Sequence, residues 1–417
     1  MRVLLVHQNF PGQYKHIAPA LAAQRGTEVV ALGMAADPGM PGVRYVRYGV
    51  ERGSSPNIHR LASDFETKVI RGEAAARAAR KLNDAGFRPD IVCAHPGWGE
   101  TLFLKEIWPD TKVLTFFEFF YSSTGADVDF DPEFPLIGDD GRFGIRAKNA
   151  GLILSMLDSD WSVAPTAWQA AQAPALIRDR ISVVHDGVDT DKVRPNPGAR
   201  IKLGRENIAL KPGDELVTFV NRDLEPYRGY HSFIRALPEI LRRRPKARAV
   251  LVGGTGVSYG GKPADGRTYK DIYLEEVRDQ LDLARVHFVG RVPYQTYLNL
   301  LQVSAAHVYL TYPFVLSWSM LESMAAGCVL IGSRTPPVEE VLRDGENGLL
   351  VDFFSPAEIA ERVVGALADH KGHLHLRHAA RRTVVENYDL KRVCLPQHLQ
   401  LIRNVSAGAL SPAQSVP

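Results

Sequence analysis

The chain has 417 residues, of which 45% are hydrophobic and 23% are charged, and its formal net charge is +3. This length exceeds what one hydrophobic core usually serves, so two domains are expected. The composition is typical of a globular protein. Because the positive charge is small, it does not indicate a nucleic-acid partner, although it suits an anionic ligand held in one cleft.

Short apolar segments set expectations about location. The N-terminal run "MRVLLVHQNF" lacks the length and cleavage site of a signal peptide, so we interpret it as a strand. No apolar run reaches the roughly 18 residues that a membrane span needs. Cys93, Cys328 and Cys394 lie in apolar contexts without metal-ligand spacing, which predicts buried thiols in a reducing compartment. We therefore expect a cytoplasmic protein without a transmembrane segment, for which peripheral membrane contact stays open.

In the first half of the chain, buried β runs alternate with helical patterns. Strands are predicted at "RVLLVH", "EVVAL", "DIVCAH" and "KVLTFF", and helices over Tyr14–Gln24 and "AAARAARKLNDAG". Short apolar strands separated by helices predict a parallel, doubly wound sheet. A bound ligand then belongs at the carboxyl ends of the strands.

The segment Ile181–Ala199 is rich in Asp, Gly and Pro and is interpreted as an interdomain linker. After it the alternation restarts with strands at "LVTFVN", "ARAVLVGG", "VHFVG" and "AHVYL". Helices are predicted after Gly229, near Lys270–Leu281 and over Tyr294–Gln302.

This order predicts two Rossmann-like α/β domains that face one another across a cleft. We expect an N-terminal domain over residues 1–190 and a C-terminal domain over residues 200–390. Residues 391–417 should form a C-terminal helix and a frayed tail, because the last of them have little to bury.

Two arginines, Arg222 and Arg228, stand around a Pro-containing turn in "FVNRDLEPYRGYHSF", between a strand end and a helix. Two guanidiniums at the carboxyl end of a strand are suited to clamping a diphosphate by charge-assisted hydrogen bonds. The alternative is a pair of surface arginines that form salt bridges with Asp223 and Glu225.

Later strand ends add further groups. Gly290-Arg291-Val292 follows a strand directly, where backbone groups can meet a flat ligand. In "SWSMLESMAAG" the start of a helix near Ser317–Ser319 offers unpaired N–H groups to a phosphate. Glu322 lies about one turn inside that helix and can accept hydrogen bonds from ribose hydroxyls. Together with the arginines, these features describe a nucleoside-diphosphate site.

In this order of segments, Val217–Leu367 resembles the retaining glycosyltransferases of family four, which have the GT-B fold. Arg222 matches the arginine of the family pattern, and Arg228 stands where the pattern has the lysine of a lysine-glycine pair. "GRV" at Gly290 and "DGENGLLV" match as they stand.

The resemblance implies a role for each matched residue. Arg291 and Val292 would flank the base of the nucleotide. Arg222 and Arg228 would hold the diphosphate and stabilise its charge as the glycosidic bond breaks. Glu322 would bind the ribose, because it matches the second glutamate of the family pair.

The sequence departs from the family at the sugar contacts. Phe314 stands where the family has its first glutamate, which contacts the transferred sugar. Ser317 and Trp318 replace the Gly and Leu of a Gly-Phe-Gly-Leu loop, although the backbone of Ser317–Ser319 can still bind phosphate or sugar. An aromatic ring at position 314 leads to the hypothesis that the donor sugar is less hydroxylated than glucose, or N-acetylated.

The N-terminal half resembles the family over shorter pieces. "HQNFPGQYKHIAPALA" keeps one glycine of the usual pair, Gly12, which would let the backbone approach the donor closely. His95, just past a strand end, matches a family histidine that faces the sugar; the alternative is a cap on the following turn. His185 in "VVHDGVD" resembles a structural linker element. Glu118, among phenylalanines and a tyrosine, could belong to an aromatic wall for a sugar or lipid-like acceptor, or be a paired carboxylate in the core.

No metal or other cofactor is expected. "LDSDW", with Asp158 and Asp160, imitates a metal-binding Asp-x-Asp motif, but two aspartates without a third ligand are weak evidence for a metal. A nicotinamide dehydrogenase is disfavoured, because "QNFPGQYKH" lacks the G-x-G-x-x-G fingerprint.

The sequence thus favours a retaining, metal-independent glycosyltransferase. It would move a sugar from a nucleoside-diphosphate sugar to a hydroxyl of a glycan, lipid-linked glycan, protein or small molecule. A UDP-sugar is the favoured donor, and a GDP-sugar stays open. One alternative is a non-hydrolysing nucleotide-sugar 2-epimerase with Glu118, His95 and His185 as its acids and bases. The other is a nucleotide-sugar-binding partner subunit without catalysis, which Phe314 favours.

Overall fold

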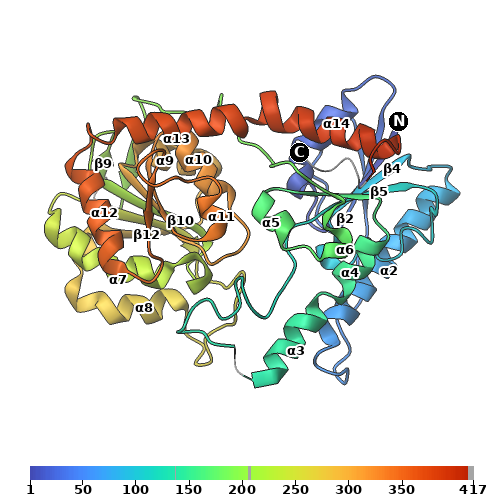
Figure 1. Ribbon diagram of the computed structural model, residues 1–417, viewed down its shortest axis with the longest axis horizontal. Coiled ribbons are helices and arrows are strands. Elements are labelled where there is room, and N and C mark those ends of the chain that lie inside the picture. Colours follow the sequence, from blue (N-terminus) through green and yellow to red (C-terminus); the bar gives the residue numbers. More distant parts are fainter. Residues whose placement is uncertain (137, 205–207, 412–417) are drawn as a thin grey trace. The chain divides into compact units, whose positions relative to one another are not determined.

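The computed structural model describes residues 1–136, 138–204 and 208–411 (Figure 1). The chain forms two compact units. Unit 1 comprises Met1–Asp186 and the segment from Lys391 onward, and unit 2 comprises Gly187–Leu390. Each unit contains its own sheet of parallel strands, so the expected class of two doubly wound α/β domains is confirmed.

Unit 1 is built on seven parallel strands in the order β3-β2-β1-β4-β5-β6-β7. The strands are β1 (Arg2–Val6), β2 (Glu28–Gly33), β3 (Val43–Arg47), β4 (Ile91–Ala94), β5 (Lys112–Phe116), β6 (Trp161–Ala164) and β7 (Ile181–Val183). Its helices are η1 (Gly12–Lys15), α1 (Ile17–Ala22), α2 (Ser63–Asp84), η2 (Pro96–Trp98), α3 (Gly138–Lys148), α4 (Ala150–Leu157), α5 (Ala167–Ala171), α6 (Ala175–Arg178) and α14 (Leu395–Ser406).

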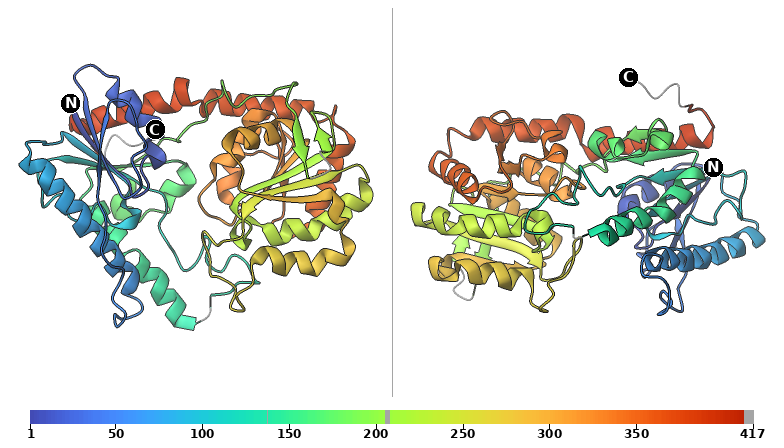
Figure 2. Two further views of the ribbon diagram at one scale, coloured as in Figure 1. Left: turned by 180° about the vertical axis from the view of Figure 1, so that it is seen from behind. Right: turned by 60° about the horizontal axis from the view of Figure 1, so that its bottom comes forward.

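Unit 2 is built on six parallel strands in the order β12-β11-β10-β13-β14-β15. They are β10 (Leu216–Asp223), β11 (Arg248–Gly254), β12 (Val286–Gly290), β13 (Ala306–Tyr309), β14 (Val329–Ser333) and β15 (Leu349–Val351); β8 (Ile201–Leu203) and β9 (Ile208–Leu210) form a separate antiparallel pair. The main helices are α7 (Tyr230–Arg243), α8 (Tyr269–Val277), α9 (Tyr294–Val303), α10 (Trp318–Ala326), α11 (Pro336–Glu339), α12 (Pro356–Ala368) and α13 (Leu374–Asn387). Figure 2 shows helices on both sides of this sheet, with α7 packed against α8 and α12, and α10 against α9 and α13.

Three predictions of secondary structure were wrong in part. The helix expected over Tyr14–Gln24 is divided into η1 and α1, because Pro19 cannot donate to the carbonyl four residues earlier and is tolerated only in the first turn of a helix. The expected linker begins too early, since β7 lies inside it and pairs with β6. The strand β3 was missed, although its sequence "VRYVR" alternates apolar and basic residues as a half-exposed edge strand does.

The last part of the described chain belongs to unit 1. Leu401, Ile402 and Val405 of α14 are buried in the same cluster as Ile17 and Leu21 of α1. Of the tail that was expected to fray, residues 412–417 lie outside the described residues.

The three cysteines are all buried, as expected. In the described part of the chain, no helix has both the length and the apolar character needed to cross a membrane.

Both sheets reverse their strand order at one place, between β1 and β4 in unit 1 and between β10 and β13 in unit 2. In open α/β sheets, the loops that leave the carboxyl ends of the two strands at such a reversal diverge and form a binding crevice. His7 and His95 follow β1 and β4, whereas Arg222 lies at the end of β10 and Thr311 just beyond β13. The fold therefore brings His95 and Arg222, among the predicted site residues, to these two places.

A glycine at the end of η3 (Pro226–Arg228) fixes the turn between β10 and α7. Gly229 has φ +67°, and a Cβ atom there would lie 2.3 Å from the Cβ of Leu310. We expect Gly229→Ala to lower the free energy of unfolding by about 1–3 kcal/mol more than Gly266→Ala, because overpacking adds to the cost of positive φ. Gly266 is the matched control, with φ +77° and no atom within 4 Å of the added Cβ. Urea denaturation of the two variants measures the difference, and equal losses would contradict the close packing at Gly229.

Candidate active site

The end of β10 carries the first group of unit 2. The pairing of β10 with β11 is irregular between Val220 and Asp223, so Arg222 lies in a bulge. The Arg222 side chain is exposed, and it makes no hydrogen bond or ion pair with any other residue that the structure describes. A guanidinium at the end of a strand is thus accessible to an anionic ligand.

The neighbouring carboxylates are engaged elsewhere. Asp223 is buried and accepts hydrogen bonds from Ser258 Oγ at 2.6 Å and from Arg291 Nη2 at 3.0 Å. Glu225 accepts from the backbone N–H groups of Ser258 and Tyr259 at 3.0 and 3.2 Å. The alternative of Arg222 and Arg228 paired with Asp223 and Glu225 is therefore not what the structure shows. Asp223 instead orients Arg291, whose side chain remains two-thirds exposed.

Arg228 is buried, unlike Arg222. Its Nη1 donates to Thr311 Oγ1 at 2.8 Å and to the Val315 carbonyl oxygen at 2.9 Å. Its guanidinium carbon lies 5.0 Å from the centre of the Tyr259 ring. Arg228 thus holds the segment between β13 and α10 in place.

The N-terminus of α10 lies at the end of this segment. Ser317 is the N-cap residue, and its backbone N–H donates to Tyr309 Oη at 2.9 Å. Ser317 Oγ and Ser319 Oγ lie 2.9 Å apart, and Trp318 is 49% exposed. One of the predicted backbone donors is therefore already engaged within the chain, while the first turn of α10 still presents its N-terminal pole.

Glu322 lies on α10 and is held by two tyrosines of α9. Its Oε1 accepts from Tyr294 Oη at 2.6 Å, and its Oε2 accepts from Tyr297 Oη at 2.7 Å. Burial, and then the Glu322 charge, raise the pKa of both phenols, so both stay protonated and donate at neutral pH. The sequence analysis missed this pair, although tyrosines three positions apart on a helix face the same side.

Phe314 does not present an accessible face. It is 4% exposed and packs edge-on against the rings of Tyr227 and Tyr259, with centroid distances of 5.6 and 4.9 Å. The burial of this ring gives no support to the expected contact with the donor sugar. Val292, by contrast, is half-buried and packs against the core of unit 2.

In unit 1, Gly12 and His7 are tightly packed. Gly12 has φ +46°, and a Cβ atom there would lie 2.3 Å from His7 Nε2. Burial, followed by the charge of His95, lowers the pKa of His7 to about 4. The glycine therefore makes room for a neutral imidazole ring, whereas the close approach of a donor to Gly12 stays a prediction.

His95 caps a turn and also faces Glu118. Its Nδ1 accepts from the backbone N–H of Gly97 at 3.1 Å, which makes it the N-cap of η2, so the proton of the neutral ring lies on Nε2. This Nε2 lies 3.5 Å from Glu118 Oε2. That distance is long for a hydrogen bond, and the buried His95 Nε2 atom has no hydrogen-bond partner among the residues that the structure describes. The Glu118 side chain is 43% exposed, so it is not the buried core carboxylate of the alternative interpretation.

A cavity of about 220 Å³ opens beside His95. Besides His95 and Glu118, the residues that line it are Asp64, Lys68, Pro96, Gly97, Trp98, Phe116, Phe119, Tyr121, Lys148 and Leu152. The Lys148 ammonium lies 3.6 Å from the centre of the Tyr121 ring. The aromatic wall expected around Glu118 is thus present in unit 1. A larger hollow of about 760 Å³ beside β3 and α2 includes none of the predicted site residues.

His185 is buried, and its carbonyl oxygen accepts from His398 Nε2 of α14 at 3.2 Å. Burial, and then the charge of His398, lower the pKa of His185 to about 4. This position ties α14 to the rest of unit 1, as expected of a structural residue.

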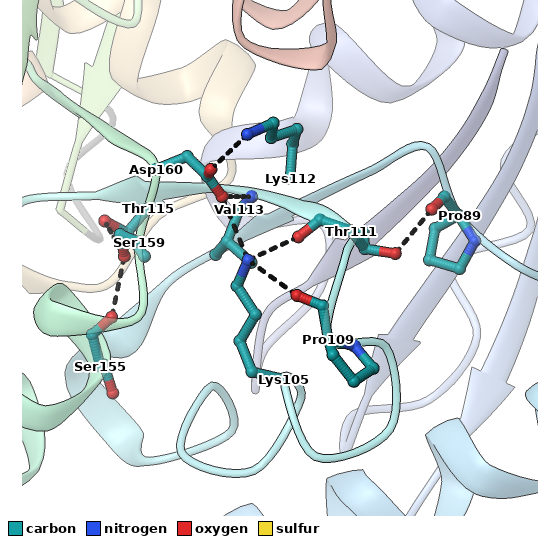
Figure 3. Close-up of polar contacts among 10 residues, drawn as sticks. All are labelled: Pro89, Lys105, Pro109, Thr111, Lys112, Val113, Thr115, Ser155, Ser159 and Asp160. Carbon is teal, nitrogen blue, oxygen red and sulfur yellow. Dashed lines mark hydrogen bonds and ion pairs between the residues drawn. The ribbon is translucent and has the colours of Figure 1, made fainter. Parts of the chain in front are cut away.

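Within the Asp-x-Asp pair, Asp160 has a set of structural partners (Figure 3). Asp160 accepts from Lys112 Nζ at 2.8 Å, from the Val113 N–H at 2.9 Å and from Lys105 Nζ at 3.3 Å, so both of its oxygens are engaged. Asp158 is exposed, and its carboxylate forms no hydrogen bond or ion pair with another described residue. Asp160 therefore anchors the start of β5 through Lys112 and Val113, whereas Asp158 does not.

Comparisons with known proteins agree with this fold. The family model of the glycosyl transferase family 4 group matches residues 25–193, and that of glycosyl transferases group 1 matches residues 202–383. The chain is 29% identical over 216 residues to a D-inositol 3-phosphate glycosyltransferase of Nocardia farcinica, covering 51% of this chain and 46% of that protein. It is 26% identical over 220 residues to spore coat protein SA of Bacillus subtilis, covering 52% of this chain and 57% of that protein. The chain spans about half the length of the curated relatives it matches.

Solved structures resemble the chain over nearly its whole length. A sucrose-phosphate synthase from Thermosynechococcus elongatus superposes with a TM-score of 0.70 at 17% identity, covering 98% of this chain and all of that one. The Anabaena protein HepE in complex with UDP-glucose superposes with a TM-score of 0.65 at 14% identity, over 98% of this chain and all of that one. The fold is therefore that of the GT-B glycosyltransferases. Taken with the two family matches, this shows that the chain belongs to the family-four glycosyltransferases.

The anchoring of Asp160 predicts a pH-dependent loss of stability in Asp160→Asn. Burial on its own raises the pKa of Asp160, but Lys112, the Val113 N–H and Lys105 outweigh it and hold the pKa below its ordinary value of 3.8. The stabilisation is therefore complete well above pH 3.8 and is lost as the pH falls through the lowered value. We expect the variant to lose about 1–2 kcal/mol at pH 7 and less below pH 3.8.

Urea denaturation between pH 7 and pH 3 measures this difference, with Asp158→Asn as the matched control, because Asp158 lies two positions earlier and has no such partners. A loss of equal size in both variants would contradict the anchoring role of Asp160.

Proposed function

We propose that the chain transfers a sugar from a UDP-sugar to an acceptor hydroxyl, with retention of the anomeric configuration and without a metal. The observation that carries this proposal is the carboxylate of Glu322, fixed by Tyr294 and Tyr297 about one turn inside α10. A fixed carboxylate of this kind can accept both hydroxyls of a ribose. HepE, which shares this fold, has been solved in complex with UDP and with UDP-glucose, and this favours a uridine donor here.

In this proposal, each group around the nucleoside diphosphate has a separate role. Arg222, exposed at the end of β10, contacts the phosphates, and the N-terminal pole of α10 adds backbone dipoles. Arg228 acts through the segment that it holds, since its Nη1 is bonded to Thr311 and Val315. Arg291 and Val292 flank the base. These fixed positive groups take the place of a divalent cation in stabilising the leaving diphosphate.

Retention follows in the proposal from attack on the face that the diphosphate leaves. The bond from the anomeric carbon to the diphosphate oxygen breaks, and its electron pair goes to the phosphate. The acceptor oxygen bonds to the same face of the carbon, and its proton passes to a phosphate oxygen. This route needs no carboxylate nucleophile beneath the sugar.

The cavity of unit 1 suits the acceptor in this proposal. Its rings, Trp98 and Phe116 among them, can pack against a sugar or polyol, and His95 Nε2–H and Glu118 offer a donor and an acceptor for hydroxyls. The ammonium of Lys148 faces the same cavity and forms no ion pair with the described residues, which favours an acceptor with a negative group. The names of several relatives, D-inositol 3-phosphate glycosyltransferases, agree with that class of acceptor.

A second candidate function, nucleotide-sugar binding without transfer, rests on one observation. The position of the first family glutamate is held by Phe314, which is buried among aromatic rings. A site that lacks this carboxylate could bind a donor and still not transfer its sugar.

The donor is tested by thermal shift and nucleotide release with UDP-, GDP-, ADP- and dTDP-sugars, with and without EDTA. We expect a UDP-sugar to stabilise the protein in both conditions and slow release of UDP. Glu322→Ala should weaken donor binding by about tenfold or more, because a hydrogen bond to a charged group contributes about 1.5–3 kcal/mol.

Glu239→Ala, which removes an exposed carboxylate paired with Arg242, is the control and should bind as the native chain does. Stabilisation without release, even after an acceptor screen, would favour the binding protein. No stabilisation by any donor would contradict the nucleotide site, and loss of release in EDTA would contradict metal independence.

A further inference from the structure

The carboxylate of Glu322 has a hydrogen bond on each oxygen before any nucleotide is bound. Tyr294, the first residue of α9, donates to Oε1, and Tyr297, nearly one turn later, donates to Oε2. The two rings are 5.8 Å apart between centroids. A ribose that approaches this carboxylate therefore finds one acceptor position on each oxygen already used by the chain itself.

The two tyrosines differ in their surroundings. Tyr297 is 8% exposed and belongs to the core cluster that also holds Leu301 and Met320. Tyr294 is 51% exposed and follows Arg291-Val292-Pro293, the segment proposed to flank the base. A core ring cannot leave its place without a large cost, so a ligand from solvent can displace Tyr294 more easily than Tyr297.

We propose that Tyr294 is a latch that competes with the ribose hydroxyls for Glu322, and that Tyr297 is the positioning residue that keeps this carboxylate aimed at them. The proposal rests on the proposed function, in which Glu322 binds the ribose. While the site is empty, the latch gives Glu322 a hydrogen bond in addition to the one from Tyr297.

The latch has a chemical consequence for selectivity. A ribonucleotide can replace the Tyr294 hydroxyl with one of its own hydroxyls, so the exchange conserves the number of hydrogen bonds to Glu322. A nucleotide without ribose hydroxyls cannot make this exchange and leaves the latch closed. The hydrogen bond between Tyr294 and Glu322 must break before a ribose hydroxyl takes its place, so it lowers the apparent affinity for ribonucleotides. It does not lower the affinity for a nucleotide without ribose hydroxyls.

The test is calorimetric titration of the full chain with UDP and with 2′,3′-dideoxy-UDP. We expect Tyr294→Phe to bind UDP about two- to tenfold more tightly, because one competing hydrogen bond is removed. The same variant should bind dideoxy-UDP as the native chain does. Tyr297→Phe should bind UDP more weakly by a similar factor and should lose part of its preference for UDP over dideoxy-UDP. A merely structural role for Tyr297 would weaken both ligands alike and leave that ratio unchanged.

A second measurement reports on the hydroxyls directly. Fluorotyrosine is incorporated, and the ¹⁹F signals of Tyr294 and Tyr297 are assigned with the two Phe variants. The Glu322→Ala variant supplies the reference signal of a Tyr294 ring that is not bonded to the carboxylate. When UDP is added to the native chain, the Tyr294 signal should move toward this reference, whereas the Tyr297 signal should not shift. With dideoxy-UDP the Tyr294 signal should not change in this way.

The outcomes separate the latch from the site it serves. If the native chain binds UDP, and Glu322→Ala loses the preference for UDP over dideoxy-UDP, the ribose role of Glu322 holds. Unchanged or weaker UDP binding by Tyr294→Phe then overturns the latch alone. If the native chain prefers neither ligand, or Glu322→Ala keeps the preference, both the latch and the ribose site are overturned.

Discussion

The buried guanidinium of Arg228 is the interaction on which the site of unit 2 depends. It lies where the strand order reverses, and its Nη1 joins the turn after β10 to Thr311 and Val315 beyond β13. A buried cation is costly unless hydrogen bonds satisfy it, so these bonds fix the path of the chain into α10. The direction of α10 in turn places Glu322 against Tyr294 and Tyr297. A substituted motif residue, arginine for lysine, thus becomes part of the architecture.

The charged residues of the turn after β10 have different partners. Asp223 binds Arg291, Glu225 binds the backbone of the segment after β11, and Arg222 is left exposed. The residues nearest to one another in the sequence are therefore not one another's partners. Asp223 and Glu225 each hold a segment that follows another strand. The guanidinium of Arg222 stays accessible to an anion.

In unit 1, two histidine rings lie where the strand order reverses. His7 and His95 follow the two strands at the reversal, with ring centroids 5.5 Å apart, and Gly12 leaves the space that the His7 ring fills. The hydrogen bond from Gly97 to His95 Nδ1 assigns the proton to Nε2, on the side of Glu118. The capping role and the proposed sugar-facing role of His95 are therefore compatible, because they use different nitrogens.

Much of this was present in the sequence. Apolar strand runs separated by helical patterns determined the fold class, because only parallel sheets with helices on both faces bury such strands. The motif order located the strand ends that carry Arg222 and Arg291, and the helix that carries Glu322. The edge strand β3 escaped notice because its side chains are only half-buried, and β7 because it is three residues long.

Only the tertiary structure decided which groups meet. Whether Phe314 faces a ligand or a core, and whether Arg228 faces solvent, depends on rings and carbonyls contributed from distant segments such as Tyr259 and Val315. The partners of Glu322 were likewise undetermined, because hydrogen bonds between helices depend on packing geometry that the spacing of residues along one helix does not specify. The sequence determined the class of protein and the position of its site. The packing decided which side chains stay free to act.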